Sequence, residues 1–251
     1  MRSYRKNILI TGASSGLGEG MAREFARLGR NLALCARRTE RLDALQRELL
    51  AKHPGIQVSV KRLDVTDTAE VFRVFGEFHA ELGGLDRIIV NAGIGLGKRI
   101  GTGNFALNLQ TAQTNFVAAL AQCEAAVELF RKQNHGHLVA ISSMSAMRGM
   151  PRHMTAYAAT KAGLTTLMEG IRAELLQTPI QVSTLFPGYI RTELNAGAKK
   201  LLFEVDAETG ARALVAAIER EPVKACVPRW PWTLVGFALR HLPLSWVARL
   251  S

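Results

Sequence analysis

A tyrosine and a lysine stand four residues apart in the segment YAATK, at Tyr157 and Lys161. On an α-helix this spacing places both side chains on one face, so the ammonium can lie near the phenol. A phenol ordinarily titrates near a pKa of ~10, and lowering that pKa to about 7 requires roughly 4 kcal/mol of extra stabilisation of the phenolate. A neighbouring cation in a site poor in water could supply it. The pair is therefore a candidate proton donor with its activator, although the same spacing is common on ordinary exposed helices.

A glycine-rich segment near the start of the chain is the candidate cofactor site. A short apolar run over residues 7–10 leads into TGASSGLG, and a helical pattern follows as far as residue 29. A strand, a glycine turn and a helix in this order form a phosphate-binding site, whereas a glycine turn without a ligand is the alternative. The first glycine permits the turn, the second lets a phosphate approach the backbone, and the third lets the helix pack close to the strand. The candidate residues are Gly12, Ser14, Ser15, Gly16, Leu17 and Gly18.

Two arginines, Arg37 and Arg38, follow the second apolar run at residues 31–36. In dinucleotide-binding folds, the residue about 20 positions past the glycines contacts the ribose. A carboxylate there accepts a hydrogen bond from the 2′-hydroxyl, whereas an arginine pairs with a 2′-phosphate. Arginine at this place favours NADP as the cofactor. The alternative is that both guanidinium groups are solvated.

Apolar runs that alternate with amphipathic segments continue along the chain. Further strands are predicted at 58–63, 85–90, 137–141, 180–186 and 223–227. Helices are predicted at 40–52, from 66 to about 78, at 105–133, around Tyr157 and at 206–220. This alternation predicts an α/β protein with a doubly wound parallel sheet of about seven strands and helices on both faces. Ligands of such sheets bind at the carboxyl ends of the strands.

Small and polar residues follow several of the predicted strands and are further candidates for cofactor contacts. Asp64 could accept a hydrogen bond from an adenine amino group, whereas Asp67 is typical of a helix cap. Thr192 could cap the next helix, or its hydroxyl could meet the amide or a phosphate of the cofactor. The candidates at these strand ends are Asp64, Val65, Asn91, Ala92, Gly93, Pro187, Gly188, Ile190 and Thr192.

The motifs TGASSGLG, LDVTD, NAG, ISS, YAATK and PGYIRT, together with Asn115, occur in the order found in the short-chain dehydrogenase/reductase family. The chain resembles this family over roughly residues 5–228. The resemblance implies a single Rossmann-type domain, a nicotinamide cofactor and a catalytic tetrad of Asn115, Ser143, Tyr157 and Lys161. The interval between the serine and the tyrosine is one residue longer than is usual in the family, which predicts a bulged loop.

The same resemblance implies a role for each member of the tetrad. Ser143 hydrogen-bonds the substrate carbonyl, and Tyr157 exchanges a proton with its oxygen. Lys161 lowers the pKa of the tyrosine and holds the ribose hydroxyls, while Asn115 holds a water that links the lysine to solvent. From the residues alone, a buried asparagine within a predicted helix more often satisfies a nearby backbone group than takes part in chemistry.

Composition and charge limit the remaining possibilities. The 251 residues are 48% hydrophobic and 21% charged, which suits one large domain, residues 1–228, followed by a tail, residues 229–251. The chain runs into its first strand without a segment typical of a secretory signal. Three cysteines far apart, Cys35, Cys123 and Cys226, suit reduced thiols in a cytoplasmic protein, and no metal site is expected.

The formal net charge of +11 fits nucleic acid, an anionic membrane surface or an anionic ligand such as a phosphate. No sequence pattern of a nucleic-acid-binding module is present, so nucleic acid is not an expected partner. The tail contains all three tryptophans and is too interrupted to cross about 30 Å of hydrocarbon. It could dock on its own domain or across a dimer, lie on a membrane surface, or cover a lipophilic substrate.

The sequence therefore predicts an NADP(H)-dependent oxidoreductase that transfers hydride between the nicotinamide and a carbonyl group or secondary alcohol, with a lipophilic substrate as one option. The alternative is a protein that binds the dinucleotide as a scaffold or sensor without turnover. We expect a cytoplasmic homo-dimer or homo-tetramer that acts on a small molecule. Peripheral membrane contact through the tail is a further option.

Overall fold

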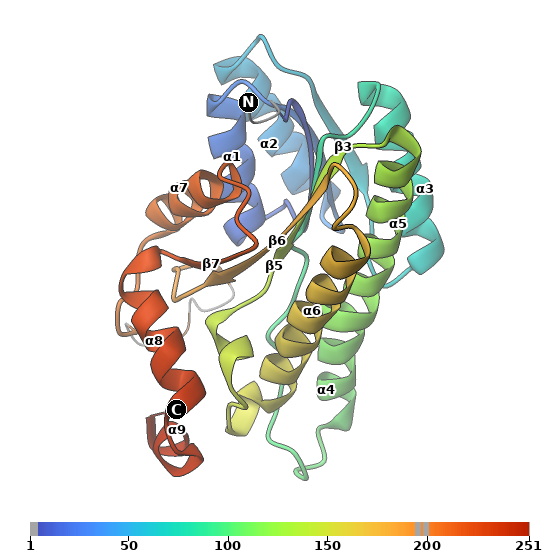
Figure 1. The fold of residues 1–251 in the computed structure, drawn as a ribbon. Helices are drawn as coiled ribbons and strands as arrows, with labels where there is room; N and C mark the ends of the chain where they lie inside the picture. The colour runs from blue at the N-terminus through green and yellow to red at the C-terminus, as the bar shows by residue number, and fades with distance from the viewer. Residues whose placement is uncertain (1–4, 194–196, 198–200, 251) are drawn as a thin grey trace.

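The computed structural model describes residues 5–193, 197 and 201–250 as an α/β fold in three layers, with helices on both faces of one parallel sheet (Figure 1). Within these residues the sheet has seven strands in the order β3-β2-β1-β4-β5-β6-β7, and all neighbouring pairs are parallel. The strands are β1 (Asn7–Thr11), β2 (Asn31–Ala36), β3 (Val58–Arg62), β4 (Arg87–Val90), β5 (Gly136–Ile141), β6 (Ile180–Pro187) and β7 (Lys224–Val227). The predicted fold class is confirmed.

Helices cover both faces of the sheet. One face carries α1 (Gly16–Arg27), α2 (Thr39–Lys52) and α7 (Ala207–Ile218). The other face carries α3 (Thr68–Leu82), α4 (Phe105–Ala112), α5 (Ala118–Gln133) and α6 (Thr155–Glu174). The last two helices, α8 (Arg229–His241) and α9 (Leu244–Leu250), follow β7 at the end of the sheet.

The apolar strands fold in this way because both of their faces are buried. Along β1 the side chains alternate, so that Ile8 and Ile10 pack among the residues of α1 and α2, and Leu9 packs among those of α3 and α5. Every residue of β2, β4 and β5 is buried. A sheet buried on both faces exposes its ligand-binding residues only where the strands end, and the order reverses between β1 and β4.

The predicted helical stretch over residues 105–133 is helical throughout, but its hydrogen-bond pattern changes in the middle. The structure has two α-helices, α4 and α5, joined by a π-helical turn at Gln113–Val117, in which the backbone N–H of Ala118 donates to the carbonyl of Gln113. A π turn inserts one residue into the helical repeat and is frequent at functional sites. Here it contains Asn115, whose buried side chain reaches out of the helix.

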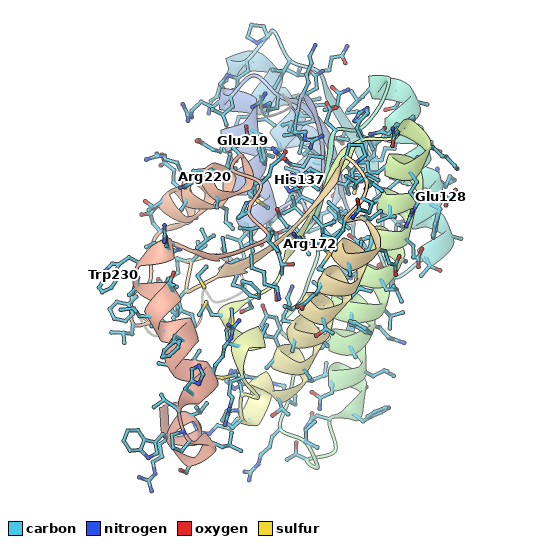
Figure 2. The ribbon with its side chains drawn as sticks, viewed as in Figure 1. Glu128, His137, Arg172, Glu219, Arg220 and Trp230 are labelled. Carbon is cyan, nitrogen blue, oxygen red and sulfur yellow. The ribbon has the colours of Figure 1, made fainter. Side chains whose placement is uncertain are left out.

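A cluster of polar and charged side chains lies at the amino ends of the strands, opposite the carboxyl ends that carry the motifs. Figure 2 labels two of its members, His137 and Glu219. The Arg87 Nε–H donates to His137 Nδ1 at 2.8 Å, and His137 Nε2 lies 2.8 Å from the hydroxyl of Ser183. The Arg87 guanidinium also pairs with Glu219 and lies 3.4 Å from Glu221. Because Nδ1 accepts a hydrogen bond, the imidazole is neutral and carries its proton on Nε2.

Burial, with the charges of Arg87 and Arg5 beside it, lowers the pKa of His137 well below its ordinary value. The unfolded chain, with a histidine pKa near ~6.5, therefore binds a proton that the folded protein excludes once the pH falls below that value. Above that pH the group is neutral in both states and costs nothing. We expect the free energy of unfolding to fall below pH ~6.5 by up to about 1.4 kcal/mol per pH unit on account of this residue.

The substitution His137→Gln removes the titration while keeping a polar side chain. We expect the variant to be about 1–3 kcal/mol less stable near neutrality but to show a shallower loss of stability towards pH 5, measured by urea unfolding across this range. The matched control is His135→Gln, because His135 is exposed rather than held between an arginine and a serine. Equal slopes for the wild type and His137→Gln would contradict the prediction.

Candidate active site

The carboxyl end of β5 and the first turns of α6 bring Ser143, Tyr157 and Lys161 together. Ser143 lies two residues past β5, where its side chain caps a 3-10 turn over Met144–Met147 and accepts a hydrogen bond from the backbone N–H of Ser145 at 3.2 Å. Tyr157 and Lys161 lie one helical turn apart on α6, with the ammonium 5.9 Å from the centre of the phenol ring. The two side chains therefore lie on one face of α6, as their spacing in the sequence predicts.

The pKa of the phenol differs from the expectation. Burial raises the pKa of Tyr157 above its ordinary value, and a side-chain hydrogen bond with Ser143 only partly offsets this. The expected lowering by Lys161 is not found in this structure, because the ammonium donates to the carbonyl of Ile141 at 2.8 Å instead of to the phenol. The phenol is consequently protonated at neutral pH, which is the state that a proton donor needs.

Lys161 is itself buried, and this desolvation lowers its pKa to about 8. Two hydroxyls fix the helix around it: Ser142 Oγ donates to the Lys161 carbonyl at 3.0 Å, and Thr160 Oγ1 donates to the Tyr157 carbonyl at 2.7 Å. Sequence reasoning missed these two positioning residues. Ser142 lies beside Ser143 in the printed motif, but nothing in the sequence separates the role of one serine from that of the other.

Asn115 acts on the backbone that follows β4. Its Oδ1 accepts from the N–H of Ile94 and its Nδ2 donates to the carbonyl of Ile94, both at 2.8 Å. The neighbouring Gly93 lies close to the candidate site. A methyl group added to it would lie 3.2 Å from Asn115 Oδ1 and 3.4 Å from Lys161 Nζ. The side chain thus clamps this segment, and the predicted water-holding role stays a prediction.

The glycine turn has the shape of a phosphate-binding site. Gly12 has a φ of +66°, and a methyl group on Gly18 would lie only 2.3 Å from the carbonyl oxygen of Gly12. Ser15 occupies the N-cap position of α1 without a capping side-chain hydrogen bond, so the first N–H groups of this helix stay available to an anion. Leu17 follows at the start of α1. These features fit the pyrophosphate of a dinucleotide.

Asn91 and Thr11 hold this turn against the end of β4. The Thr11 hydroxyl accepts from the backbone N–H groups of Asn91 at 3.0 Å and Ala92 at 3.1 Å. In return the Asn91 Nδ2 donates to the carbonyl of Thr11 at 2.9 Å. Asn91 is therefore at the predicted site, but its amide supports the protein backbone. The sequence places both Thr11 and Asn91 at the end of a predicted strand, and β1 and β4 are neighbours in the sheet.

The two arginines after β2 are arranged differently from one another. Arg38 lies over the glycine turn, where it donates to Ser14 Oγ at 3.2 Å and Ser15 Oγ at 2.5 Å and pairs with Glu193 at 3.3 Å. Arg37 is exposed, and the structure gives its side chain no hydrogen bond or ion pair with any described residue. Its charge lies near the carboxylate of Asp64, which follows β3. Glu193 had no sequence signal, since it lies far along the chain from Arg38.

Asp64 lies at the end of β3 beside the buried Val65. Its Oδ1 accepts from the backbone N–H and the hydroxyl of Thr66, at 3.0 and 2.8 Å. Burial alone would raise the pKa of Asp64, but these hydrogen bonds and the nearby charges of Arg37 and Arg62 bring it below its ordinary value. The carboxylate is thus ionised, and its contact with an adenine stays a prediction. Asp67 caps α3, as predicted, by accepting from the N–H of Glu70.

The loop after β6 is held by the tail. Gly188 follows Pro187, and a methyl group on Gly188 would lie 2.0 Å from Cε2 of Trp232 on α8. Trp232 is buried and meets the Tyr189 ring edge to face at 5.2 Å. Of the arrangements predicted for the tail, docking on its own domain is therefore seen for α8. Sequence reasoning did not single out Trp232 from the other two tryptophans.

Two further candidates of this loop lie close to α1 and α7. Ile190 is buried, and a methyl group on Gly210 of α7 would lie 2.4 Å from its Cγ2 atom. Thr192 lies beside the glycine turn, 3.5 Å from the place of a methyl group on Gly16. The helix that Thr192 was predicted to cap falls on a stretch that includes 194–196 and 198–200, which lie outside the described residues.

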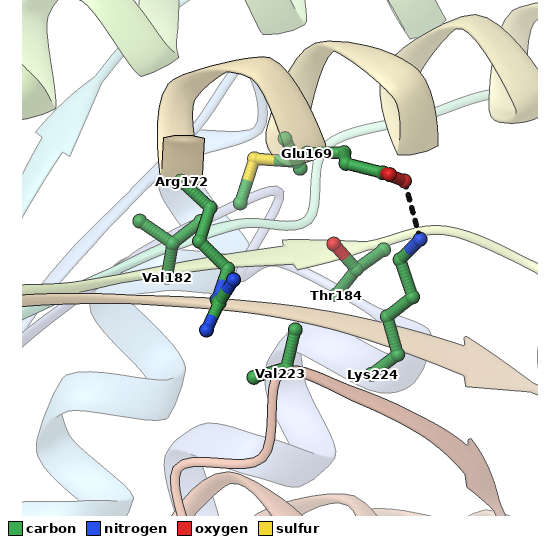
Figure 3. A pocket seen from close by; sticks show the side chains of 7 residues that line it. Glu169, Arg172, Val182, Thr184, Val223 and Lys224 are labelled. Atoms are coloured by element: carbon green, nitrogen blue, oxygen red, sulfur yellow. Dashed lines mark hydrogen bonds and ion pairs between the residues drawn. The ribbon is translucent and has the colours of Figure 1, made fainter. Parts of the chain in front are cut away.

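The hollow in Figure 3 is distinct from this site. It has a volume of about 150 Å³ and lies between α6 and the last two strands, where Lys224 Nζ and Glu169 Oε2 are 2.5 Å apart. A second hollow of about 330 Å³ lies at the start of α4. Neither is lined by a predicted site residue. Among the described residues there is also no group of three acidic, histidine or cysteine side chains that could hold a metal ion.

Comparisons with known proteins point to one family. A family model described as short chain dehydrogenase matches residues 6–201. An uncharacterized oxidoreductase of Mycobacterium tuberculosis is 54% identical over 228 residues, which cover 91% of this chain and 90% of that protein. An uncharacterized oxidoreductase of Myxococcus xanthus is 38% identical over 200 residues, covering 77% and 75%. The solved short-chain dehydrogenase from Sphingobium yanoikuyae in complex with NADPH is 29% identical, with 93% of each chain covered and a TM-score of 0.80.

Proposed function

The chain belongs to the short-chain dehydrogenase family, and from this premise we propose that it is an NADP(H)-dependent oxidoreductase acting on a carbonyl group or a secondary alcohol. The observation that carries the proposal is the protonated phenol of Tyr157, hydrogen-bonded to Ser143 and one turn from a buried lysine. These groups lie at the carboxyl edge of the sheet, where the glycine turn also lies.

In carbonyl reduction the bound nicotinamide supplies the hydride. Ser143 holds the substrate oxygen by a hydrogen bond, and Tyr157 transfers its phenolic proton to that oxygen as charge develops on it. Lys161 would hold the ribose hydroxyls of the cofactor, and with a pKa of about 8 it can return a proton towards the phenol near neutral pH. In alcohol oxidation the same proton path runs in the opposite direction.

The preference for NADP rests on the arginines after β2. Arg38 supports the glycine turn through Ser14 and Ser15, which leaves the exposed Arg37 to pair with a 2′-phosphate. The NADPH complex of the Sphingobium relative supports the same choice. A carboxylate able to accept from a ribose 2′-hydroxyl is absent from positions 37 and 38.

Replacing Arg37 with aspartate is expected to raise the Kd of NADPH by about 10- to 100-fold, because a charge-assisted hydrogen bond is replaced by repulsion. The Kd of NADH should change by no more than about threefold. Titration of both cofactors by intrinsic fluorescence measures the two affinities. Arg47→Asp, at an exposed position on α2, is the matched control. Equal weakening of NADPH and NADH would refute the cofactor assignment.

Apolar side chains beside the serine support a lipophilic substrate. Met144 packs with Phe186 and Trp232 into a small apolar cluster, which Met147 and Val235 extend. Met side chains adapt to irregular apolar shapes. A panel of ketones and aldehydes of rising chain length, followed through the absorbance of reduced nicotinamide, tests the activity. Binding of NADPH without turnover across the whole panel would favour the dinucleotide-binding scaffold instead.

We further propose a homo-dimer or homo-tetramer in the cytoplasm. Exposed apolar side chains on the outer side of α4 and α5, at Phe105, Leu109 and Leu120, support the assembly. Burial raises the pKa of the Cys123 thiol to about 12, so this group stays protonated and inert, which suits a reducing compartment. Light scattering of the purified protein measures the oligomeric state.

A further inference from the structure

Helix α8 has two apolar faces, and only one of them is covered. Trp232 and Gly236 pack against the domain, next to Met144 and Cys226. The residues Trp230, Leu234 and Phe237 lie on the other side with 74, 58 and 65% of their surface exposed. Figure 2 shows Trp230 pointing away from the body of the protein. Helix α9 adds Leu244 and Trp246, each 59% exposed.

This exposed face continues onto two neighbouring segments. The Arg148 guanidinium donates to the carbonyl of Arg240 at 3.2 Å, which joins α8 to the segment after β5. That segment in turn meets the loop before α4, because a methyl group on Gly97 would lie 2.4 Å from the carbonyl oxygen of His153. We call the combined surface of residues 94–104, 144–154 and 229–249 the basic end.

The basic end contains positive charges and no negative ones. The sequence has no aspartate or glutamate within residues 87–123, 129–168 or 222–251. The cations of the basic end are Lys98, Arg99, Arg148, Arg152, Arg229, Arg240 and Arg249. Exposed apolar side chains lie among them, including Leu96 and Ile100 in the loop before α4. A surface of this kind is complementary to an anionic layer that also offers an apolar interior.

We propose that the basic end docks on the surface of an anionic lipid bilayer. Exposed tryptophan, phenylalanine and leucine side chains would enter the boundary between headgroups and acyl chains, and the arginines would pair with the headgroups. An isologous contact with a second copy of this chain is disfavoured, because it would bring two acid-free basic surfaces together. Among the described residues, no helix has both the length and the hydropathy of a membrane span.

The basic end borders the candidate active site. The turn Met144–Met147, which follows Ser143 directly, lies at this surface with Met147 half-buried, whereas Met144 is buried beneath it. A docked protein would therefore face the bilayer with the segment that borders its candidate active site, and an apolar carbonyl compound could pass from lipid to protein. The docking inference does not depend on catalysis, because vesicle binding is measured without cofactor or turnover.

Co-sedimentation of the full chain with vesicles tests the proposal. We expect binding to vesicles of phosphatidylcholine mixed with phosphatidylglycerol to be at least about tenfold tighter than to phosphatidylcholine alone, and to weaken as salt is added. Absence of binding to the anionic vesicles, or equal binding to both kinds, would overturn it.

Two pairs of double variants separate the contributions of charge and apolar contact. K98E/R99E should weaken binding about 25-fold or more, because each basic residue near an anionic surface contributes about fivefold. F237S/W246S should weaken it about tenfold. The matched controls carry the same changes on distant exposed positions, R47E/R220E and L50S/F72S.

Each variant is first shown to be folded by a urea-unfolding midpoint close to that of the wild type. If the controls reduce vesicle binding as much as the variants of the basic end, the proposal fails. It fails also if the variants of the basic end change the mass of the assembly in light scattering while vesicle binding stays the same. That result would identify the exposed face as a contact between copies of the chain.

Discussion

Replacing Tyr157 with phenylalanine is expected to lower kcat/KM for carbonyl reduction by about 10³-fold, within the range that general acid catalysis supplies. Phenylalanine keeps the ring that packs near Lys161 and removes only the hydroxyl that carries the proton. The substrate oxygen would then receive its proton from water. The affinity for NADPH should stay within about threefold of the wild type, because the glycine turn and the arginines are untouched.

The chain offers a matched control at Tyr189, which lies in the loop after β6 and contacts Trp232 edge to face. Tyr189→Phe removes the same atom close to the same site but preserves the aromatic contact. Steady-state kinetics on any ketone found in the panel should show the large loss for Tyr157→Phe alone. A Tyr157→Phe enzyme that retains more than about a tenth of the wild-type activity would rule out the phenol as the proton donor.

Replacing Gly18 with alanine is expected to destabilise the protein by about 2–3 kcal/mol and to weaken NADPH binding by at least about tenfold. The added methyl group would lie 2.3 Å from the carbonyl oxygen of Gly12 and 2.8 Å from the Asn91 amide nitrogen. The first of these neighbours is backbone, so relief of the contact requires α1 to move away from β1. The phosphate-binding N–H groups would move with the helix.

Gly76→Ala is the control for this substitution. Gly76 lies within α3, and a methyl group added there would meet no atom within 4 Å, so alanine should leave NADPH binding unchanged and stabilise the protein by up to about 1 kcal/mol. Urea unfolding and fluorescence titration measure the two quantities for both variants. Normal stability together with normal NADPH affinity in Gly18→Ala would show that the helix does not need to lie so close to the strand.

The sequence was sufficient for the sheet because its strands are buried on both faces and read as apolar runs with glycine or polar residues at their ends. The position of the candidate site could be predicted for the same reason, because the residues that follow parallel strands meet at one edge of the sheet. The relation of Tyr157 to Lys161 followed from helical spacing alone. The π-helical turn at residues 113–117 did not follow, because apolar periodicity does not show where a single residue is inserted into the helical repeat.

Electrostatic features were harder to predict than positions. The pKa of Tyr157 depends on how much water burial removes and on where the ammonium of Lys161 points, and here it points to the Ile141 carbonyl. The pairing of Arg38 with Glu193 joins residues far apart in the chain, so no local pattern announces it. Such contacts form only once the fold has brought their elements together.

The packing of Trp232 against Gly188 has a practical meaning for handling this protein. A chain cut after residue 228 would lack the indole that covers Phe186 and Met144, and would leave those side chains in water. Removing residues 229–251 as a dispensable extension would therefore expose this apolar cluster and favour aggregation. It would also leave the loop after β6 without its support. Point substitutions on the outer side of α8 are the safer way to study what that segment does.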